Sequence, residues 1–391
     1  MMERELKVVC FGGEDWWYHN RGHMDMQLMR RFARMGTTLY INSIVMQKPG
    51  LKRGVSGGKS FSQRLWRKSK SILKGLRKSN DSFWVYSPLS LPVHHISWAR
   101  WLNEKLLTFQ VSQITRKLHL GHPIVWVACP AACDIAIKMK KMKLIYQRTD
   151  VMELAPNVDS NTIMGYDRKL KANADLTVFV NSALYNRESN QCKKAIFLDH
   201  GVDYESFAKA EESSWIPEDI AEIKKPIVGF FGAINGNNTT NVELIEKLAE
   251  LLPQISIVLI GSISSDCSSL LSKDNVWWLG QKVYEEIPHY GKCLDVCLMP
   301  WRQNRWIEAC NPIKLKEYLA LGKPVVSTPF TELQKYQDVV YQANTPQEFA
   351  ECIKRALAEN SPERIAARRK RVESSTWDNK AELVLQELFK K

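Results

Sequence analysis

The sequence lacks the features that mark several large classes of protein. Among its 391 residues, no window approaches the roughly 18 consecutive apolar residues that span a bilayer. Two acidic residues precede the short apolar run near the N-terminus and no small-residue cleavage site follows it, so a signal peptide is not expected. The nine cysteines include no C-x-x-C pair, and the two C-x-x-x-C pairs lack histidines at zinc-ligand spacing, which favours free buried thiols. We therefore expect a cytoplasmic protein with no metal site.

Acidic residues are also absent from one long stretch of the chain. The net charge is +13, and residues 52–78 hold ten Lys or Arg with no Asp or Glu. Within this stretch, residues 61–78 place six large apolar side chains among seven cations, a pattern typical of a helix that binds a membrane interface. We expect residues 52–80 to meet an anionic membrane surface. A basic surface helix or an insertion without this role stays open, whereas no nucleic-acid-binding module fits the chain.

Short β-rich runs alternate with helical patterns, and the alternation starts twice. A buried strand at residues 7–11 ends in Gly12 and Gly13, and a second one at 227–231 ends in Gly232. Such alternation predicts parallel sheets built from βαβ units. The predicted division of this α/β chain is an N-terminal domain over residues 1–203, a linker over 204–225, a second domain over 226–374 and a C-terminal helix within 375–391 that packs back on the first domain.

Hydrophobic periodicity places the other elements. In open α/β sheets, ligands bind at the carboxyl ends of the strands, so a cleft between two such domains is the expected site. Further strands are predicted at residues 38–41, 123–128, 143–147, 173–182, 195–198, 255–260, 276–279, 295–299 and 324–327. Helices are predicted at residues 25–35, 241–252, 313–321, 346–358 and 377–389.

One segment of the second half combines the parts of a phosphate site. In residues 311–328, NPIKLKEYLALGKPVVST, Pro312 suits the first turn of a helix and Gly322 ends that helix. A helix N-terminus offers unpaired N–H groups and a positive dipole end to a diphosphate, and Lys314 would add a charged contact. Glu317, one turn further, would accept hydrogen bonds from the two hydroxyls of a ribose. An exposed Lys–Glu pair at i,i+3 spacing is the alternative.

This segment resembles the donor-site motif of GT-B glycosyltransferases, especially family four and the teichuronic-acid type of transferase. Four other stretches agree with that family in their order. They are ADLTVFVNS at 174–182, HGVD at 200–203, VGFFGAI at 228–234 and WWLGQKVYEEIPHYGKCLDVCLMPW at 277–301. The similarity covers most of residues 5–390. It implies two Rossmann-like doubly wound domains facing across a cleft, with the acceptor on the first domain and a nucleotide sugar on the second.

The resemblance also implies roles for single residues. Glu317 matches the second glutamate of the family's E-x7-E motif, which holds the donor ribose. Asn311, Pro312 and Ile313 match the loop that meets the diphosphate. The other donor-binding positions that the resemblance implies are Gly12 and Gly13 after the first strand, Gly232 in the second domain, and Gln281 to Val283, where the base is usually held.

The sequence departs from the family at two places. The first glutamate of E-x7-E would fall at Ala309, with Glu308 one residue away, which leaves the contact to the transferred sugar open. The Arg and Lys that often follow Gly232 in the family are missing. The groups left to meet the diphosphate charge are Lys314, Arg302, Arg305 and backbone amides.

The expected mechanism follows from further absences. The sequence has neither a serine or cysteine nucleophile motif nor the D-x-D pair that holds a metal in the other glycosyltransferase fold. We therefore expect metal-independent catalysis without a cofactor, by positioning and by stabilising the departing nucleoside diphosphate. An inverting enzyme also needs a general base, and the candidates are Asp150, Asp15 and His23. Structural roles are the alternative for two of them. Asp150 could be a loop residue or cap a helix, and His23 could make a structural hydrogen bond at the start of a helix.

Together these observations predict a transferase that moves a sugar from a nucleoside diphosphate, with uridine as the expected base. The expected acceptor is a cell-envelope or other polysaccharide intermediate, as a free glycan or linked to polyprenyl diphosphate at the inner face of the plasma membrane. Two alternatives stay open: a GT-B sugar-nucleotide epimerase, and a catalytically weak binding subunit of a polysaccharide synthase. The sugar, the linkage and the stereochemical outcome also stay open.

Overall fold

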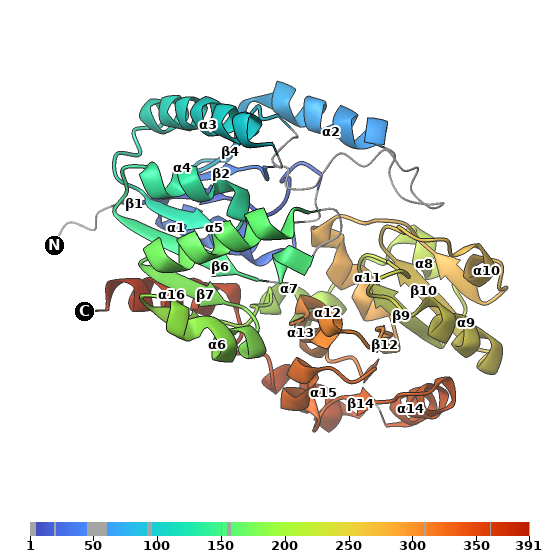
Figure 1. The fold of residues 1–391 in the computed structure, drawn as a ribbon. Coiled ribbons are helices and arrows are strands. Elements are labelled where there is room, and N and C mark those ends of the chain that lie inside the picture. The colour runs from blue at the N-terminus through green and yellow to red at the C-terminus, as the bar shows by residue number, and fades with distance from the viewer. Residues whose placement is uncertain are drawn as a thin grey trace. The chain divides into compact units, whose positions relative to one another are not determined.

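The computed structural model describes residues 5–18, 21–44, 61–91, 96–149, 151–154, 158–308, 310–359 and 361–390. The chain folds into two compact units, the first and the second domain (Figure 1). The first domain holds the described chain up to Asp199 and again from Trp377 onward, and the second domain holds His200–Thr376. Each domain has its own sheet and its own hydrophobic core.

The first domain is built on one sheet of eight described strands in the order β3-β4-β2-β1-β5-β6-β7-β8. Neighbouring strands are parallel, except that β3 at the edge runs antiparallel to β4. Because β1 lies between β2 and β5, the strand order reverses at the end of β1. The strands are β1 (Leu6–Phe11), β2 (Gly36–Ile41), β3 (Leu76–Asn80), β4 (Phe83–Tyr86), β5 (Ile124–Val127), β6 (Lys143–Arg148), β7 (Leu176–Phe179) and β8 (Ala195–Phe197).

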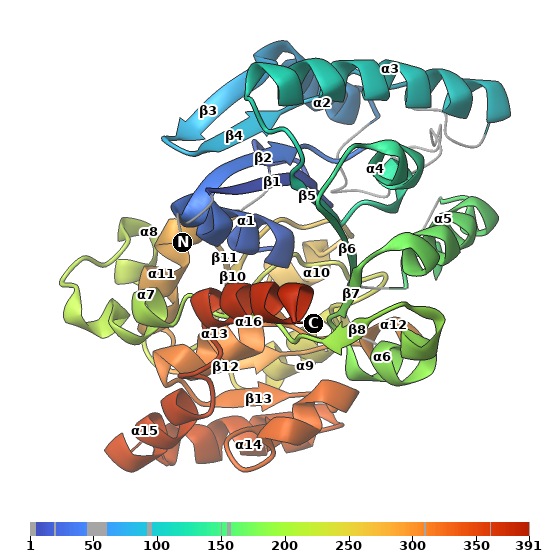
Figure 2. The same cartoon turned by 90° about the vertical axis from the view of Figure 1, so that its left-hand side faces the viewer.

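Helices cover both faces of this sheet. Figure 2 shows α1 and α16 on one side and α3, α4 and α5 on the other. On the second side, Leu107 and Val111 of α3 and Ile135 of α4 are buried in one cluster with the strands. The helices are α1 (Met24–Met35), α2 (Phe61–Lys74), α3 (Ser97–Lys117), α4 (Cys133–Lys138), α5 (Ser160–Asn173), α6 (Ser182–Glu188) and α16 (Trp377–Phe389).

The C-terminal helix α16 packs in the first domain. Trp377 at its start is fully buried. The Asp378 carboxylate accepts a hydrogen bond from Arg34 at 2.9 Å and lies 3.6 Å from the Arg31 guanidinium, both of helix α1. The last helix of the chain is therefore held to the first helix by burial and by charge.

The second domain has a sheet of six described strands in the order β11-β10-β9-β12-β13-β14, all parallel. This is the order of a doubly wound dinucleotide-binding fold. The strands are β9 (Ile227–Phe231), β10 (Ser256–Ile260), β11 (Val276–Trp278), β12 (Val296–Met299), β13 (Val325–Ser327) and β14 (Tyr341–Gln342). The helices are α7 (Tyr204–Ala208), α8 (Glu218–Ala221), α9 (Val242–Leu251), α10 (Ser268–Leu271), α11 (Ile287–Cys293), α12 (Arg305–Glu308), α13 (Ile313–Leu321), α14 (Pro346–Ala358) and α15 (Pro362–Lys370).

Residues 204–225, for which the sequence predicts a linker, fold as part of the second domain. They contain α7 and α8, and their apolar side chains Phe207 and Ile220 are buried in the core that packs beneath α13. The segment is polar in composition, but two well-placed apolar residues are enough to dock these short helices.

The predicted α/β class with two doubly wound domains is confirmed, whereas one long helix escaped prediction. In α3 the apolar side chains lie on several sides of the helix, so no single stripe marks it in the sequence. Ala99 and Leu107 face the core, but Trp98 and Trp101 are exposed. None of the helices in the described part of the chain combines the length and the apolarity needed to cross a bilayer.

Candidate functional site

The second domain gathers its predicted site residues at the point where its strand order reverses. Strand β9 has β10 on one side and β12 on the other, and Gly232 follows β9 directly. Pro300 and Trp301 follow β12. Ligands of open α/β sheets bind at the carboxyl ends of the strands at this reversal. The fold therefore provides a ligand position beside Gly232.

Helix α13 begins at this position without a side-chain cap. Its N-cap is Pro312, which has no hydrogen-bonding side chain and makes no side-chain capping bond. The first amides of the helix are therefore available to an anion, and the helix dipole adds a partial positive charge. At the other end, Gly322 closes the helix in the left-handed conformation, with φ of 79°.

The Lys314 side chain lies directly on Gly232. A Cβ atom built on Gly232 would come within 2.4 Å of Lys314 Nζ, so only glycine lets the ammonium approach the end of β9. The ammonium also lies 4.4 Å from the centre of the Phe230 ring and 5.8 Å from that of Trp301. Burial of the ammonium among these groups lowers the pKa of Lys314 to about 8, although Glu317 opposes the shift.

Glu317 is buried one turn further along the same helix, with 5% of its surface exposed. Burial raises the pKa of Glu317 to about 7, and the Asp203 carboxylate adds to this rise. The nearby Tyr284 hydroxyl and Lys314 favour the charged form without outweighing burial. In the described chain, no ion pair within 4 Å joins Glu317 to a cation. The helix thus carries a half-buried cation and a buried carboxyl at the strand reversal.

The HGVD stretch packs against helix α13. The Lys316 ammonium, buried within the domain, donates a hydrogen bond to the His200 carbonyl. The Val202 N–H donates to the Ser375 carbonyl at 2.8 Å, which ties the stretch to the end of the domain. These bonds fix Asp203 close enough to influence Glu317. The sequence did not indicate that Tyr284 and Asp203 lie near Glu317, because both come from segments far from α13 in the sequence.

The loop after Gly232 carries no cation but is tightly built. The Asn235 carbonyl accepts hydrogen bonds from the N–H groups of residues 238, 239 and 240, at 3.2, 2.9 and 2.9 Å. Arg302, predicted to meet the diphosphate, donates instead to the Gly236 carbonyl and to the Glu243 carboxylate, at 2.5 Å each. Arg302 therefore holds the loop in place, and Lys314 is the predicted cation whose charge lies against Gly232.

The other predicted positions of this domain are more open. Gln281 and Val283 are exposed in the loop after β11, where Gly280 has φ of 72°. Asn311 and Ile313 are partly exposed. Glu308 and Arg305 are exposed on the short helix α12. Ala309, the position of the missing glutamate, lies outside the described residues.

In the first domain, the glycine loop after β1 is closed by a buried carboxylate. A Cβ atom on Gly12 would come within 2.1 Å of the Tyr40 hydroxyl group, so glycine is required there. The Gly13 N–H donates to the Asp25 carboxylate at 2.8 Å, and the Tyr40 hydroxyl donates to the same oxygen at 2.9 Å. Asp25, 2% exposed in the first turn of α1, thus occupies the Gly13 amide that was predicted to face the donor phosphate.

The candidate bases of the first domain differ in their surroundings. The Asp15 carboxylate accepts hydrogen bonds from the Trp17 N–H at 3.0 Å and from the Ser71 hydroxyl at 2.7 Å, so both of its oxygens are engaged. His23 is exposed at the N-cap of α1. Asp150 lies outside the described residues.

His23 also acts on a neighbouring acid. The Glu14 side chain is exposed as a whole, yet packing around its carboxyl raises the Glu14 pKa, and the positive charge of His23 opposes this rise. Arg21, two residues before His23, adopts φ of 64° and lies over the Trp16 ring. The loop between β1 and α1 therefore brings an imidazole, a guanidinium and several carboxylates together.

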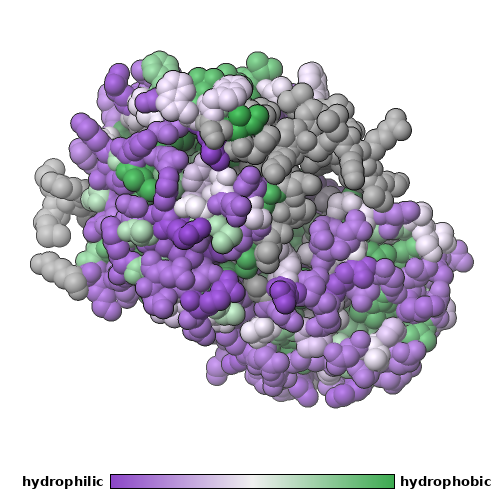
Figure 3. Space-filling view, viewed as in Figure 1, coloured by the Kyte–Doolittle hydropathy of each residue, from purple (hydrophilic) through white to green (hydrophobic). Residues whose placement is uncertain are grey.

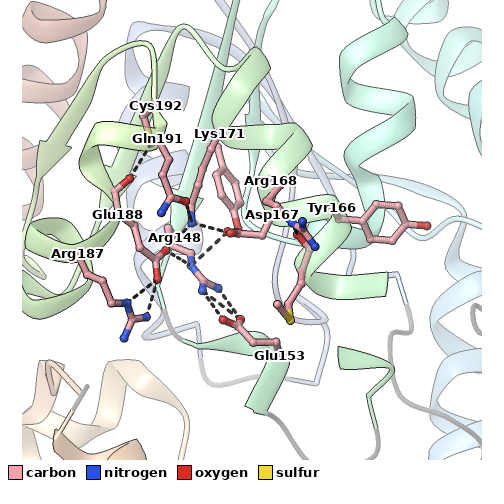
Figure 4. Close-up of polar contacts among 12 residues, drawn as sticks. Arg148, Glu153, Tyr166, Asp167, Arg168, Lys171, Arg187, Glu188, Gln191 and Cys192 are labelled. Atoms are coloured by element: carbon pink, nitrogen blue, oxygen red, sulfur yellow. Dashed lines mark hydrogen bonds and ion pairs between the residues drawn. The ribbon is translucent and has the colours of Figure 1, made fainter. Parts of the chain in front are cut away.

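A buried charge network lies at the end of β6, two residues before Asp150 (Figure 4). The Arg148 guanidinium, 1% exposed, donates to both oxygens of Glu153 at 2.9 to 3.1 Å. Its Nε lies 3.2 Å from Asp167 and 3.4 Å from Glu188. Lys171 pairs with the same two carboxylates, at 2.6 and 2.5 Å. Every charge in this network has a partner of opposite sign.

The pKa of Glu188 shows how this network is balanced. Burial alone would raise the Glu188 pKa, but hydrogen bonds from Lys171 and Arg187 outweigh burial and hold the pKa below its usual value. Nothing local in the sequence signals the network, because its members come from β6, from α5 and α6, and from the 3-10 turn at Met152–Leu154. The network fastens these elements to one another at the end of β6.

Comparison with known proteins finds a family match within the second domain. Residues 225–359 match the family described as glycosyl transferases group 1. A Bacillus subtilis (strain 168) protein, provisionally named teichuronic acid biosynthesis glycosyltransferase TuaH, is 26% identical over 251 residues. This match covers 59% of the chain and 62% of the relative, so the chain spans less than two thirds of the relative's length.

Solved structures extend the comparison to the fold of the whole chain. Sucrose-phosphate synthase from Thermosynechococcus elongatus aligns with a TM-score of 0.68 and 14% identity, over 97% of this chain and 98% of that one. HepE of Anabaena, in complex with UDP and glucose, aligns with a TM-score of 0.65 and 14% identity, over 99% and 100%. At this identity the structures show the fold, which is GT-B. The chain therefore has the GT-B fold, and its residues 225–359 are similar to glycosyl transferases group 1.

Proposed function

We propose that the chain transfers a sugar from a nucleoside diphosphate, with UDP as the carrier, to a cell-envelope or polysaccharide acceptor. The observation that carries this proposal is the pair of half-buried Lys314 and buried Glu317 at the strand reversal of the second domain. The printed descriptions of the structural neighbours add support, since HepE was solved with UDP and with UDP-glucose. The name of the TuaH relative supports an acceptor of the cell-envelope polysaccharide class.

The chemistry of the two side chains matches the two halves of a nucleoside diphosphate. A diphosphate would accept hydrogen bonds from the Lys314 ammonium and from the uncapped amides at the start of α13. The ribose hydroxyls would donate to the Glu317 carboxylate. As the bond to the sugar breaks, negative charge grows on the leaving diphosphate, and the same cation and amides stabilise it. Lys314 would thereby take the role that a metal ion or the missing Arg and Lys fill elsewhere.

In the first domain, we propose His23 and Asp150 as the candidates for handling the acceptor proton. His23 is exposed at the start of α1, and an imidazole is the side chain that most often serves as a general base. Asp15 serves a different purpose in this proposal, because both of its oxygens already accept hydrogen bonds. Asp15 would fix the loop that carries His23.

We also propose that the first domain meets an anionic membrane surface through the basic segment at residues 52–80, at the inner face of the plasma membrane. In the described part of this segment, Trp66 and Leu73 of α2 are 62% and 82% exposed. The inner side of α2 is held by polar contacts instead, since buried Ser71 bonds Asp15 and Lys68 bonds the Ser43 carbonyl. The helix thus turns apolar and cationic side chains outward. A lipid-linked acceptor would be presented at such a surface.

A binding and transfer assay tests the donor part of the proposal. UDP-glucose and matched UDP-, GDP- and ADP-sugars are titrated against the whole chain by calorimetry, and release of the nucleoside diphosphate is followed with and without a glycan acceptor. We expect binding of at least one UDP-sugar and faster UDP release when the acceptor is present. Conversion of the UDP-sugar into its epimer without acceptor would favour the epimerase alternative. Binding without any turnover would favour the non-catalytic subunit.

Paired variants test whether Lys314 and Glu317 are the residues that bind the nucleotide sugar. Lys314→Met and Glu317→Gln each remove one charge from α13. Lys354→Met and Glu351→Gln are the matched controls, because they form an exposed pair at the same spacing on α14, 2.8 Å apart. We expect the first two variants to lose nucleotide-sugar binding and the second two to retain it. Equal behaviour of the two sets would contradict the proposal.

A further inference from the structure

Helix α3 carries a row of exposed apolar side chains. Trp98 and Trp101 are 62% and 60% exposed, Leu102 is 41% exposed and Phe109 is 62% exposed. Their spacing of three, four and seven residues places them on one side of the helix. The row extends over about 17 Å, at 1.5 Å of rise per residue. We call Trp98, Trp101, Leu102 and Phe109 the α3 stripe.

The α3 stripe is a fixed feature of the surface. On the opposite side of α3, Ala99, Leu107 and Val111 are buried in the core of the domain. Two side chains lock the rotation of the helix further. Asn103 bonds both the N–H and the carbonyl of Leu91, at 2.7 and 2.9 Å, and Gln110 bonds both groups of Leu89, at 2.9 Å each. The stripe therefore has no route into the core without breaking these four bonds.

Neighbouring side chains enlarge the apolar surface. Leu89, held beside α3 by Gln110, is itself 51% exposed. In both ribbon views, α2 and α3 lie at the top, above β4 (Figures 1 and 2). Helix α2 carries exposed Trp66 and Leu73. In the space-filling view, hydrophobic side chains gather at this top edge (Figure 3). Exposed apolar side chains gathered in one region of the surface mark an interaction site.

The charges around the stripe indicate what covers it. Lys105 is exposed between Leu102 and Phe109, and the nearest acid on the helix, Glu104, is already paired with Lys138. Exposed Lys70 and Lys74 of α2 add to the positive charge. A second copy of the chain would bring these cations face to face, which disfavours self-association through this surface. Tryptophans next to lysines are instead the composition of a helix that lies in the interface of an anionic bilayer.

We propose that the α3 stripe inserts into the interface of an anionic lipid bilayer and, with α2, anchors the first domain there. The choice of a bilayer as partner rests on the proposed function, whereas the insertion of α3 goes beyond it. Helix α3 lies in the interface and does not span the bilayer, since it is not apolar enough to cross one. The aromatic side chains supply the apolar contact, and the lysines supply attraction to anionic headgroups.

Vesicle sedimentation tests the insertion. The whole chain is mixed with vesicles of phosphatidylcholine alone and with vesicles that also contain phosphatidylglycerol. The triple variant Trp98→Ser, Trp101→Ser, Phe109→Ser is expected to lower the partition coefficient on the anionic vesicles by about a hundredfold or more. The control variant Trp215→Ser, Leu251→Ser, Phe389→Ser removes three apolar side chains of 42% to 49% exposure elsewhere, and it should bind as the wild type does.

Two further measurements distinguish insertion into the bilayer from surface adsorption and from self-association. Lipids brominated on their acyl chains should quench tryptophan fluorescence more in the wild type than in the variant Trp98→Phe, Trp101→Phe, because only the wild type places these indoles in the bilayer. Size-exclusion chromatography with light scattering measures self-association of the same proteins. Donor binding is measured in parallel and should be unchanged in the triple variant, so a failure of anchoring is distinguished from a failure of the nucleotide-sugar proposal.

Several outcomes would overturn the proposal. The first is a triple variant that binds anionic vesicles as tightly as the wild type, and the second is a wild type that binds no vesicles. The third is a dimer that the triple variant abolishes, since the stripe would then be an interface between copies. If only charge reversal at Lys70 and Lys74 abolishes vesicle binding, then α2 alone is the anchor and the role of α3 is refuted.

Discussion

Two buried clusters of charge, one in each domain, are handled in contrasting ways. In the first domain, Arg148 and Lys171 are almost fully buried, and both lie within 3.4 Å of carboxylates that are buried with them. In the second domain, half-buried Lys314 and buried Glu317 have no ion pair between them in the described chain, and their pKa values move toward each other, to about 8 and about 7. Burying a charge without a partner destabilises a fold.

This difference indicates that the Arg148 network stabilises the fold, whereas Lys314 and Glu317 serve ligand binding. A network in which each charge is paired holds elements together, and removing one member leaves a buried charge behind. A cation and a carboxyl that stay unpaired at a strand reversal lower stability, and a ligand that supplies the missing partners removes that cost. Perturbed pKa values in such a place indicate a binding site rather than a structural clamp. Each of the variants below tests one side of this comparison.

The largest expected effect is on the stability of the first domain. Arg148→Met leaves the Glu153, Asp167 and Glu188 carboxylates buried with too little positive charge, and we expect it to lower the free energy of unfolding by about 3 kcal/mol or more. Urea denaturation followed by tryptophan fluorescence measures the loss. Lys169→Met, which breaks an exposed ion pair with Asp134 in the same domain, is the control and should change little. If Arg148→Met lowers the free energy of unfolding as little as Lys169→Met does, the network does not stabilise the first domain.

The next effect is on donor affinity in the second domain. Lys314→Met removes the ammonium that lies against Gly232, and we expect UDP-glucose to bind about a hundredfold more weakly, as for the loss of a hydrogen bond between charged groups. Isothermal titration calorimetry measures this. Lys316→Met removes a neighbouring lysine of α13 whose hydrogen bond goes to the His200 carbonyl, so its main effect should be on stability. A Lys314→Met variant of unchanged affinity would remove the cation from the proposed site.

A smaller effect is the pH dependence of donor binding. A diphosphate prefers the protonated Lys314, so UDP-glucose affinity should fall by about tenfold per pH unit once the pH exceeds the Lys314 pKa of about 8. Ribose hydroxyls prefer the ionised Glu317, so affinity should also fall as the pH drops below the Glu317 pKa of about 7. Calorimetry across this range should show the highest affinity between the two values.

Two variants show which residue causes the fall in UDP-glucose affinity on each side of the optimum pH. Lys314→Met should lack the alkaline limb, and Glu317→Gln should lack the acidic limb. A UDP-sugar carries no phosphate group that titrates near pH 6, so it is a better probe than UDP. A profile that is flat from pH 6 to pH 9, the range of about three units spanning both limbs, would contradict the assignment.

The sequence predicted those parts of the site that are local in the chain. Pro312, Gly322 and the spacing of Lys314 and Glu317 lie within one helix, and capping rules and helical periodicity apply there without knowledge of the fold. Most strands of both sheets were likewise visible as short apolar runs, but β3, β4 and β14 were not predicted. The sequence did not indicate which side chains would face Glu317, because Asp203 and Tyr284 reach it only through the tertiary fold.

Other features depend on partners that are distant in the sequence. Arg302 was predicted to bind phosphate, but the structure pairs it with Glu243, and no local pattern links two residues so far apart. The Arg148 network joins four elements in the same way. Helix α3 escaped prediction because its apolar residues serve two surfaces, the core and the exposed stripe, and this removes the periodic signal of a half-buried helix.

The most direct test of the central claim is the thermal melting of Glu317→Gln with and without UDP-glucose. The raised pKa means that the folded chain holds a proton on Glu317 that the unfolded chain releases between about pH 4.5 and 7, so stability falls as the pH rises through this range. A neutral glutamine avoids this loss. At pH 7.5, about half a unit above that range, we expect the variant to gain about 1 kcal/mol in the free energy of unfolding, which raises the melting temperature by a few degrees.

The same experiment reports on the ligand. The wild type should melt at a higher temperature when UDP-glucose is present, by mass action, whereas Glu317→Gln should show little or no shift. We predict that Glu317→Gln melts at a higher temperature than the wild type without ligand, and that UDP-glucose does not raise its melting temperature further. A variant that is less stable than the wild type, as Arg148→Met is expected to be, and that still responds fully to UDP-glucose would show that Glu317 is a structural residue and would contradict the account.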